Sequence, residues 1–312
     1  SMDEPYAAIC GISEDEIRLQ MKDDLGGLAK KLEITPEEAL MKLKENYDGY
    51  HFTSPSPDIY NPFSLLNAFA DGKFGSYWFG SGTPTYLVKM LDKFGVKPSE
   101  IGRRQLKSSV FDAPTETMTD AVPLLYQSGY ITIKDYNKML DLYTLDIPNK
   151  EVRLGLMESL LPYYVNNKTP EATTMVAYLF YDIQNGDMDA ALHRLQEFLS
   201  TIPYCDNTRF EGHYQQVFYI IFSLLGYYVD VEVRTPRGRV DIVLRTKTTL
   251  YVMELKLDKS AGEAMEQIDL KNYPERFALC GLPVVKVAVS FDSERCTIGG
   301  WEIINADYVV DL

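Results

Sequence analysis

Two short segments near the C-terminus, residues 239–244 and 250–257, constrain the fold of this chain more than any other feature. Both alternate apolar residues with polar or charged ones over part of their length, and a polar turn at residues 245–249 separates them. This pattern predicts an antiparallel β-hairpin. If the turn is symmetric about residues 247 and 248, Asp241 lies directly opposite Glu254.

The predicted register can be tested within the sequence itself. It also pairs Ile242 with Met253, Val240 with Leu255 and Leu244 with Tyr251, so that one face of the hairpin is entirely apolar. A slip of one residue would move every side chain of a strand to the other face. The consistent apolar face therefore supports the pairing.

The other face of the hairpin would carry two acids and an amine. Directly opposed residues have Cβ atoms about 4.5–5.5 Å apart, and like charges there destabilise the sheet unless something compensates them. A divalent cation would do so, and Mg²⁺ suits oxygen ligands. Lys256 projects from the same face as Glu254 because it lies two residues further along the strand. Phosphodiester hydrolysis needs such a cation to polarise phosphate and to lower the pKa of bound water.

The alternative interpretation is that Asp241, Glu254 and Lys256 form a solvated salt-bridge cluster on an exposed sheet face. The hairpin alone does not distinguish the two interpretations. A helix is predicted before the hairpin, from Arg209 to Gly226. It favours the catalytic interpretation, because it presents Glu211 beside a continuous apolar stripe. Glu211 either interacts with the positive end of its helix or holds a second metal or a water.

A second helix is predicted after the hairpin, where Ser260 and Glu263 form a capping box. Gln267 and Lys271 are i,i+4 neighbours on this helix, so they share one face. That face could contact DNA phosphate, although residues at such positions are more often ordinary surface residues. Their position after the Glu-x-Lys strand raises the weight of the functional interpretation.

The rest of the chain divides into three predicted modules. Residues 1–119 read as mostly helical, with capping boxes at Ser13 and Thr35. Residues 120–165 follow the order helix, hairpin, helix, with strands at 130–133 and 142–145, which is a winged-helix-like order. Mixed charge at the hairpin tip favours packing or coupling over DNA binding. Residues 166–204 are predicted to form a helical connector that breaks at Asn185-Gly186-Asp187. Residues 205–312 form the final predicted domain, whose last element is a short strand near 301–304.

Composition excludes several classes of protein. The 312 residues are 46% hydrophobic, yet no apolar run approaches the roughly 20 residues of a membrane helix. The polar, acidic start predicts no secretory signal, which implies a cytoplasmic setting. Four scattered cysteines and three histidines support neither a disulfide framework nor a zinc site. The net charge of −14 argues against a broad basic surface, so any contact with DNA must be local.

These residues together resemble the PD-(D/E)XK nuclease superfamily. The pattern is a helix with Glu211, then Gly238-Arg239-Val240-Asp241, then Glu254-Leu255-Lys256, then Glu266-Gln267-Ile268 and Tyr273. The resemblance implies a restriction-endonuclease-like mixed sheet flanked by helices, hence an α/β domain in a chain that is α+β overall. It also implies that Asp241, Glu254 and the Leu255 carbonyl hold Mg²⁺, or Mn²⁺ in its place. Lys256 would assist catalysis, Glu211 and Gln267 would line the catalytic site, and Arg239, Lys271 and Tyr273 would contact substrate.

The whole chain is similar to the C-terminal part of bacterial proteins, of the Bacteroidetes and Clostridia type, that join an AAA-ATPase-like region to such a nuclease domain. The motifs that carry this similarity are residues 46–50, 60–64, 77–78, 127–130 and 147–152. No Gly-x4-Gly-Lys-Ser/Thr phosphate loop occurs, so ATPase activity is not expected. Residues 1–119 would be the remnant of the ATPase region.

The preferred function is a Mg²⁺-dependent nuclease that hydrolyses nucleic acid, with DNA as the first choice of substrate. The alternative is a catalytically silent nuclease fold that serves as a binding or regulatory module for an AAA-type ATPase, and the acidic balance favours it. A winged-helix DNA-binding regulator ranks last. A homo-oligomer or an ATPase region absent from this chain remains open as a partner, and no membrane is expected.

Overall fold

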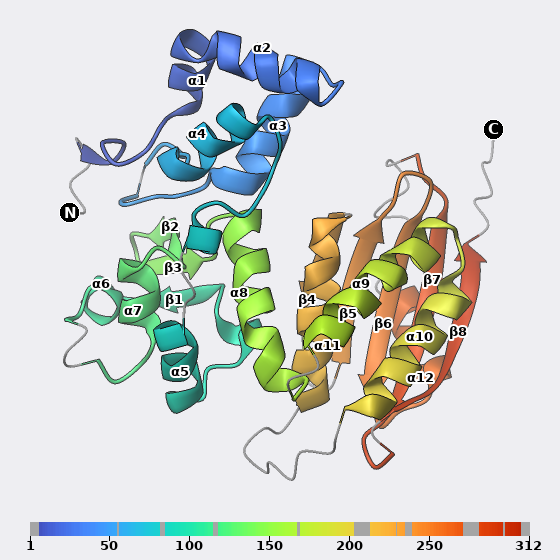
Figure 1. The fold of residues 1–312 in the computed structure, drawn as a ribbon. Helices are drawn as coiled ribbons and strands as arrows, with labels where there is room; N and C mark the ends of the chain where they lie inside the picture. The colour runs from blue at the N-terminus through green and yellow to red at the C-terminus, as the bar shows by residue number, and fades with distance from the viewer. Residues whose placement is uncertain are drawn as a thin grey trace. The chain divides into compact units, whose positions relative to one another are not determined.

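The computed structural model describes residues 6–54, 56–81, 85–114, 118–166, 169–202, 213–228, 230–234, 239–270, 281–295 and 297–306. The chain separates into two compact units, residues 1–159 and 160–312. Both units mix helices with one β-sheet (Figure 1). Within the described ranges, no helix is both long enough and apolar enough to cross a bilayer.

Unit 1, residues 1–159, begins with helices whose starts the sequence predicted. Ser13 and Glu16 close a capping box at one helix, and Thr35 and Glu38 close another, with Pro36 in its first turn. The helices are α1 (Glu14–Gln20), α2 (Lys22–Lys31), α3 (Pro36–Tyr47), α4 (Pro62–Asp71), α5 (Thr85–Lys93), α6 (Ser108–Phe111) and α7 (Val122–Gln127), with short 3-10 helices η2 (Phe79–Ser81) and η3 (Pro98–Glu100).

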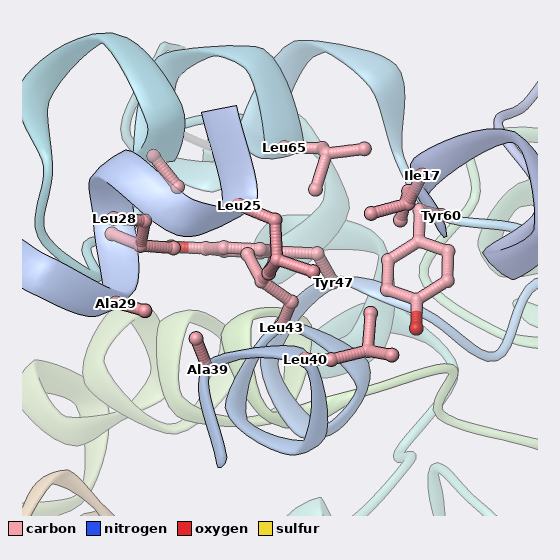
Figure 2. Packing of buried hydrophobic residues seen from close by; sticks show 11 residues of the cluster. Ile17, Leu25, Leu28, Ala29, Ala39, Leu40, Leu43, Tyr47, Tyr60 and Leu65 are labelled. Carbon is pink, nitrogen blue, oxygen red and sulfur yellow. The ribbon is translucent and has the colours of Figure 1, made fainter. Parts of the chain in front are cut away.

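The core of the first four helices is organised around one aromatic side chain. Figure 2 shows Tyr47 crossing the centre of a cluster of buried side chains that includes Leu25, Leu28 and Leu43. Tyr47 is fully buried, and its hydroxyl exchanges 2.9 Å hydrogen bonds with the backbone N–H and carbonyl of Gly75. This polar end is therefore satisfied inside an otherwise apolar cluster.

The sheet of unit 1 contains a hairpin and one additional strand. Strands β2 (Thr132–Asn137) and β3 (Leu142–Asp146) pair antiparallel, and β1 (Arg104–Leu106) joins the other side of β3. The first strand of this hairpin was predicted at 130–133, whereas β2 continues to Asn137, so the turn is shorter than predicted. Tyr136 stacks on Tyr143 across the strands with ring centroids 4.3 Å apart, which extends the pairing. The helix α8 (Lys150–Tyr164) follows and completes the predicted order of elements.

The five upstream motifs meet in one buried network of unit 1. Glu151 is 5% exposed, and its carboxylate accepts hydrogen bonds from the Ser64 hydroxyl at 2.6 Å and from the backbone N–H of Trp78 at 2.8 Å. The Asn149 amide donates to the Asp48 carbonyl at 3.0 Å. The rings of Trp78 and Tyr130 lie 5.5 Å apart. Motifs that are separate in the sequence thus anchor the start of α8.

Unit 2, residues 160–312, holds a five-stranded mixed sheet with the order β4-β5-β6-β7-β8. Among the strands that the structure describes, only β6 and β7 pair in parallel, and α12 lies between them in the chain. The strands are β4 (Asp230–Arg234), β5 (Arg239–Arg245), β6 (Leu250–Leu257), β7 (Val284–Asp292) and β8 (Thr297–Ala306). The helices are α9 (Thr169–Gln184), α10 (Met188–Thr201), α11 (His213–Leu224), the 3-10 helix η5 (Leu225–Tyr227) and α12 (Ala261–Leu270).

Helices cover both faces of this sheet. Figure 1 shows α9 and α10 crossing one face, where the Tyr251 hydroxyl donates to the Ile183 carbonyl at 3.3 Å. On the same face, α11 places Phe218 against Phe291 with ring centroids 5.4 Å apart. On the other face, α12 packs Ala264, Met265 and Ile268 over the sheet. The α/β class predicted for this domain is confirmed.

Three details of unit 2 differ from or refine the sequence predictions. The break between α9 and α10 is confirmed, and Gly186 occupies it with a φ of +79°. The predicted apolar stripe of α11 was too narrow, because every residue from Gln216 to Leu224 is buried. The predicted short strand near 301–304 is the ten-residue β8, which pairs along nearly all of β7.

Candidate active site

The hairpin of β5 and β6 has the register that the sequence predicted. Asp241 faces Glu254, Ile242 faces Met253 and Leu244 faces Tyr251. The turn between the strands is closed by Thr246, whose hydroxyl accepts hydrogen bonds from the backbone N–H groups of Thr248 and Thr249 at 3.3 and 3.0 Å. A Thr side chain that binds its own turn in this way fixes the local backbone.

The predicted apolar face of the hairpin lies against α9 and α11. Its members are buried, with exposed fractions of 3% or less: Val240, Ile242, Leu244, Tyr251, Met253 and Leu255. Because side chains alternate along a strand, the acids Asp241 and Glu254 lie on the opposite face with Lys256. We call this opposite face the site face.

The carboxylates of the site face are withdrawn from solvent. Asp241 is 8% exposed and Glu254 is fully buried, whereas Lys256 is half-buried. Glu254 occupies the central strand of the sheet, with Asp241 on one side and Ala288 of β7 on the other. Two directly opposed acids in such a position are costly unless cationic groups or hydrogen bonds accompany them.

Helix α12 covers the same face, next to the acids. Its buried side chains pack on Leu250 and Val252, which precede Glu254 on β6. The predicted capping box at its start is confirmed, with the Glu263 backbone N–H donating to the Ser260 hydroxyl at 3.2 Å. Gln267 is half-buried on this helix. The structure therefore brings Gln267 to the layer that covers the site face.

Comparison with known proteins assigns a superfamily to the region that contains the hairpin. The model of a family described as the PD-(D/E)XK nuclease superfamily matches residues 209–301. Residues 209–301 form a PD-(D/E)XK nuclease superfamily domain. The matched region contains α11, the hairpin and α12, and it ends within β8.

Similarity to one curated protein extends beyond this nuclease domain. A protein of Azotobacter chroococcum mcd 1, named "Uncharacterized protein in vnfD 5'region", is 30% identical over 318 residues, which covers 97% of this chain. The chain spans 58% of the length of that relative. No solved structure matches the chain.

Several predicted site residues of the nuclease domain lie outside the described residues. These are Glu211, Lys271 and Tyr273. Arg239 begins β5, and its backbone is described and pairs in register with Lys256 of β6, but its side chain is not described. The roles assigned to these four residues remain predictions.

The donor atoms of the nuclease domain fit a hard divalent cation. Asp241 and Glu254 present carboxylates at directly opposed positions, and the backbone carbonyl of Leu255 follows Glu254 on the same strand. Oxygen donors of this kind suit Mg²⁺ or Mn²⁺ rather than thiolate-bound metals. Within the described ranges, no cluster of three or more His, Cys, Asp or Glu side chains could hold a metal. The carboxylates of Asp241 and Glu254 and the backbone carbonyl of Leu255 are thus the candidate metal ligands among the described residues.

Sequence reasoning missed the residues that neighbouring strands add to the site face. Arg234 of β4 lies directly opposite Asp241, and Ser290 of β7 is in register with Lys256. Lys286, two residues before Ala288 on β7, forms a 2.7 Å ion pair with Asp269 of α12. The signal for Arg234 was present in the sequence, because a turn symmetric about Arg237 and Gly238 would have given the same pairing.

Proposed function

We propose that the nuclease domain hydrolyses phosphodiester bonds of nucleic acid with the help of a divalent cation, and that DNA is its substrate. The observation that carries the proposal is the pairing of Asp241 with Glu254 on one sheet face, with Lys256 beside them. The superfamily match over residues 209–301 supports the same activity.

The chain supplies three kinds of group for this reaction. Asp241, Glu254 and the Leu255 carbonyl would hold Mg²⁺, which, when bound, polarises the phosphate and lowers the pKa of water. Lys256 would donate hydrogen bonds to the phosphate or to the attacking water and so neutralise the charge that develops there. Gln267 and Glu211 would line the site, and Arg239, Lys271 and Tyr273 would contact the nucleic acid.

The charge of the protein sets how it would bind. A net charge of −14 repels a polyanion at long range, so binding must depend on a few cations close to the site. Lys256 is such a cation, and its half-buried position on the same face as the buried carboxylates would keep its charge close to a phosphate bound there. We therefore expect modest affinity with strong dependence on local Lys and Arg residues.

Cleavage assays test the proposal directly. The parent protein should cleave plasmid or single-stranded DNA in Mg²⁺ or Mn²⁺, and Lys256→Ala and Asp241→Asn should each lower the rate by roughly 10²-fold or more. Lys247→Ala is the matched control, because it removes the same charge from the exposed turn of the hairpin and should leave the rate unchanged. Equal rates for Lys256→Ala and the parent would rule out this site, and an RNA substrate assayed in parallel tests the choice of DNA.

A second candidate function is a catalytically silent module that binds or regulates an AAA-type ATPase region. The complete burial of Glu254 and the acidity of the chain favour it. The relative of greater length is compatible with a further region outside this chain. A folded parent that cleaves neither DNA nor RNA in either metal would favour this second candidate.

A further inference from the structure

Strand β4 adds an arginine to the flank of the carboxylate pair. Arg234 is paired with Asp241, which is itself paired with Glu254, so three strands carry these side chains in one row. Directly opposed residues point to the same face of a sheet, with Cβ atoms about 4.5–5.5 Å apart. The guanidinium of Arg234 therefore belongs to the site face.

The row is graded in exposure from one strand to the next. The Arg234 side chain is 53% exposed, whereas Asp241 is 8% exposed and Glu254 is buried. Lys256 is half-buried on the far side of Asp241, on β6. A strand of nucleic acid that approached the carboxylates would thus meet a cation on each side of them, one from β4 and one from β6.

Arg234 forms an exposed ion pair with a neighbouring acid, Glu232. Glu232 lies two residues earlier on the same face of β4, and its Oε1 accepts hydrogen bonds from Nε and Nη2 of Arg234 at 2.8 and 2.5 Å. The Glu232 side chain is 48% exposed. Exposed ion pairs of this kind contribute little to stability, because water and salt compete for both charges. A phosphate oxygen can therefore compete with Glu232 for the guanidinium of Arg234.

We propose that Arg234 binds a phosphate of the substrate at the cleavage centre, opposite Lys256. Arginine suits this role because its planar fork of N–H donors matches two phosphate oxygens at once. This inference rests on the proposed nuclease function and adds a substrate-binding residue to it. The competing explanation is that Arg234 and Glu232 form an ordinary surface ion pair on an edge strand.

The test compares Arg234→Ala and Arg234→Lys with Arg245→Ala. Arg245 is an exposed residue of β5 on the same face, four residues from Asp241, so its replacement removes the same charge. Arg234→Ala should weaken binding of a labelled single-stranded oligonucleotide by on the order of tenfold and raise KM similarly. It should also reduce the slope of log affinity against log salt by about one contact.

Two further variants separate phosphate binding from a structural role. Arg234→Lys keeps the charge but loses the fork, so it should fall between the parent and Arg234→Ala. Glu232→Gln removes the competing carboxylate and should tighten binding severalfold, which a merely structural ion pair would not do. If Arg234→Ala melts at a lower temperature than the parent, the Arg234→Lys and Glu232→Gln results decide the question.

The outcomes distinguish this inference from the proposed function. If the parent cleaves, Lys256→Ala does not, and Arg234→Ala has the KM and salt slope of Arg245→Ala, then Arg234 is not a phosphate ligand and the nuclease assignment stands. If the parent and Lys256→Ala are equally inactive, the nuclease assignment fails and the inference fails with it.

Discussion

Replacing Asp48 by Asn should stabilise unit 1 above pH 6 and should have little effect near pH 4. Asp48 follows α3, and its side chain is 2% exposed. Burial raises the pKa of this carboxyl from 3.8 to about 6. The Gly49 backbone N–H and the amines of Lys44 and Lys134 act in the opposite direction, and the nearby Asp58 adds to the effect of burial.

The sign follows from proton binding. Between pH 4 and 6 the folded protein keeps a proton on Asp48 that the unfolded chain has lost, so the free energy of unfolding falls as pH rises. The favourable contribution is complete below pH 4 and is lost as pH passes 6. A rise in pKa of about two corresponds to ~3 kcal/mol at pH 8, and roughly half of that is already present at pH 5. Asparagine has the same shape and does not ionise, so it avoids this cost.

The two tryptophans of the chain make the measurement specific to unit 1. Trp78 lies in unit 1 and Trp301 in unit 2, so a Trp301→Phe background leaves Trp78 as the only tryptophan reporter. Urea unfolding followed by its fluorescence should show that Asp48→Asn gains ~1.5 kcal/mol more over the parent at pH 8 than at pH 5. Asp92→Asn, at an exposed position of α5, is the control and should show no such gain. A destabilised Asp48→Asn protein at pH 8, or a difference that does not change with pH, would refute the reasoning.

Two further predictions concern the metal site and the packing of α8. Mg²⁺ at about 100 times its Kd should stabilise unit 2 by ~3 kcal/mol, measured by Trp301 fluorescence in a Trp78→Phe background. Asp241→Asn should abolish this stabilisation, whereas the control Glu266→Gln, at an exposed position of α12, should retain it. A parent protein that Mg²⁺ does not stabilise would argue against the metal site. Gly155→Ala should destabilise unit 1 by ~1–3 kcal/mol, because the added Cβ would overlap the buried ring of Phe79. The control Gly27→Ala in α2, where an added Cβ meets no neighbouring atom, should be neutral or stabilising. Equal urea midpoints of unfolding for the two variants would contradict the packing argument.

The hairpin register could be predicted because it depends on local rules alone. A strand alternates with a period of two, and a short symmetric turn leaves one pairing that keeps Ile242, Met253 and Leu255 on one face. The capping boxes at Ser13 and Thr35 were equally accessible, since each depends on residues three positions apart. The opposed positions of the candidate site residues Asp241 and Glu254 follow from the same local rules.

Features that depend on distant contacts could not be predicted in this way. Strand β1 is only three residues long, and its pairing with β3 crosses more than thirty positions of sequence. The buried polar face of α11, with Gln216 and Ser223, depends on the helices and strands that surround it. Glu151 gave no local sign that it would accept hydrogen bonds from Ser64 and Trp78.

The short turn at residues 246–249 has a consequence for how this domain can change over time. The hydrogen bonds that Thr246 accepts stabilise this turn, and the number of residues in it determines that Glu254 rather than Leu255 pairs with Asp241. One inserted residue would move every side chain of β6 to the opposite face of the sheet, so that Glu254 would point toward the apolar face that lies against α9 and α11. Natural variants should therefore differ freely in the identity of Lys247 and Thr248 while preserving the number of residues between the strands.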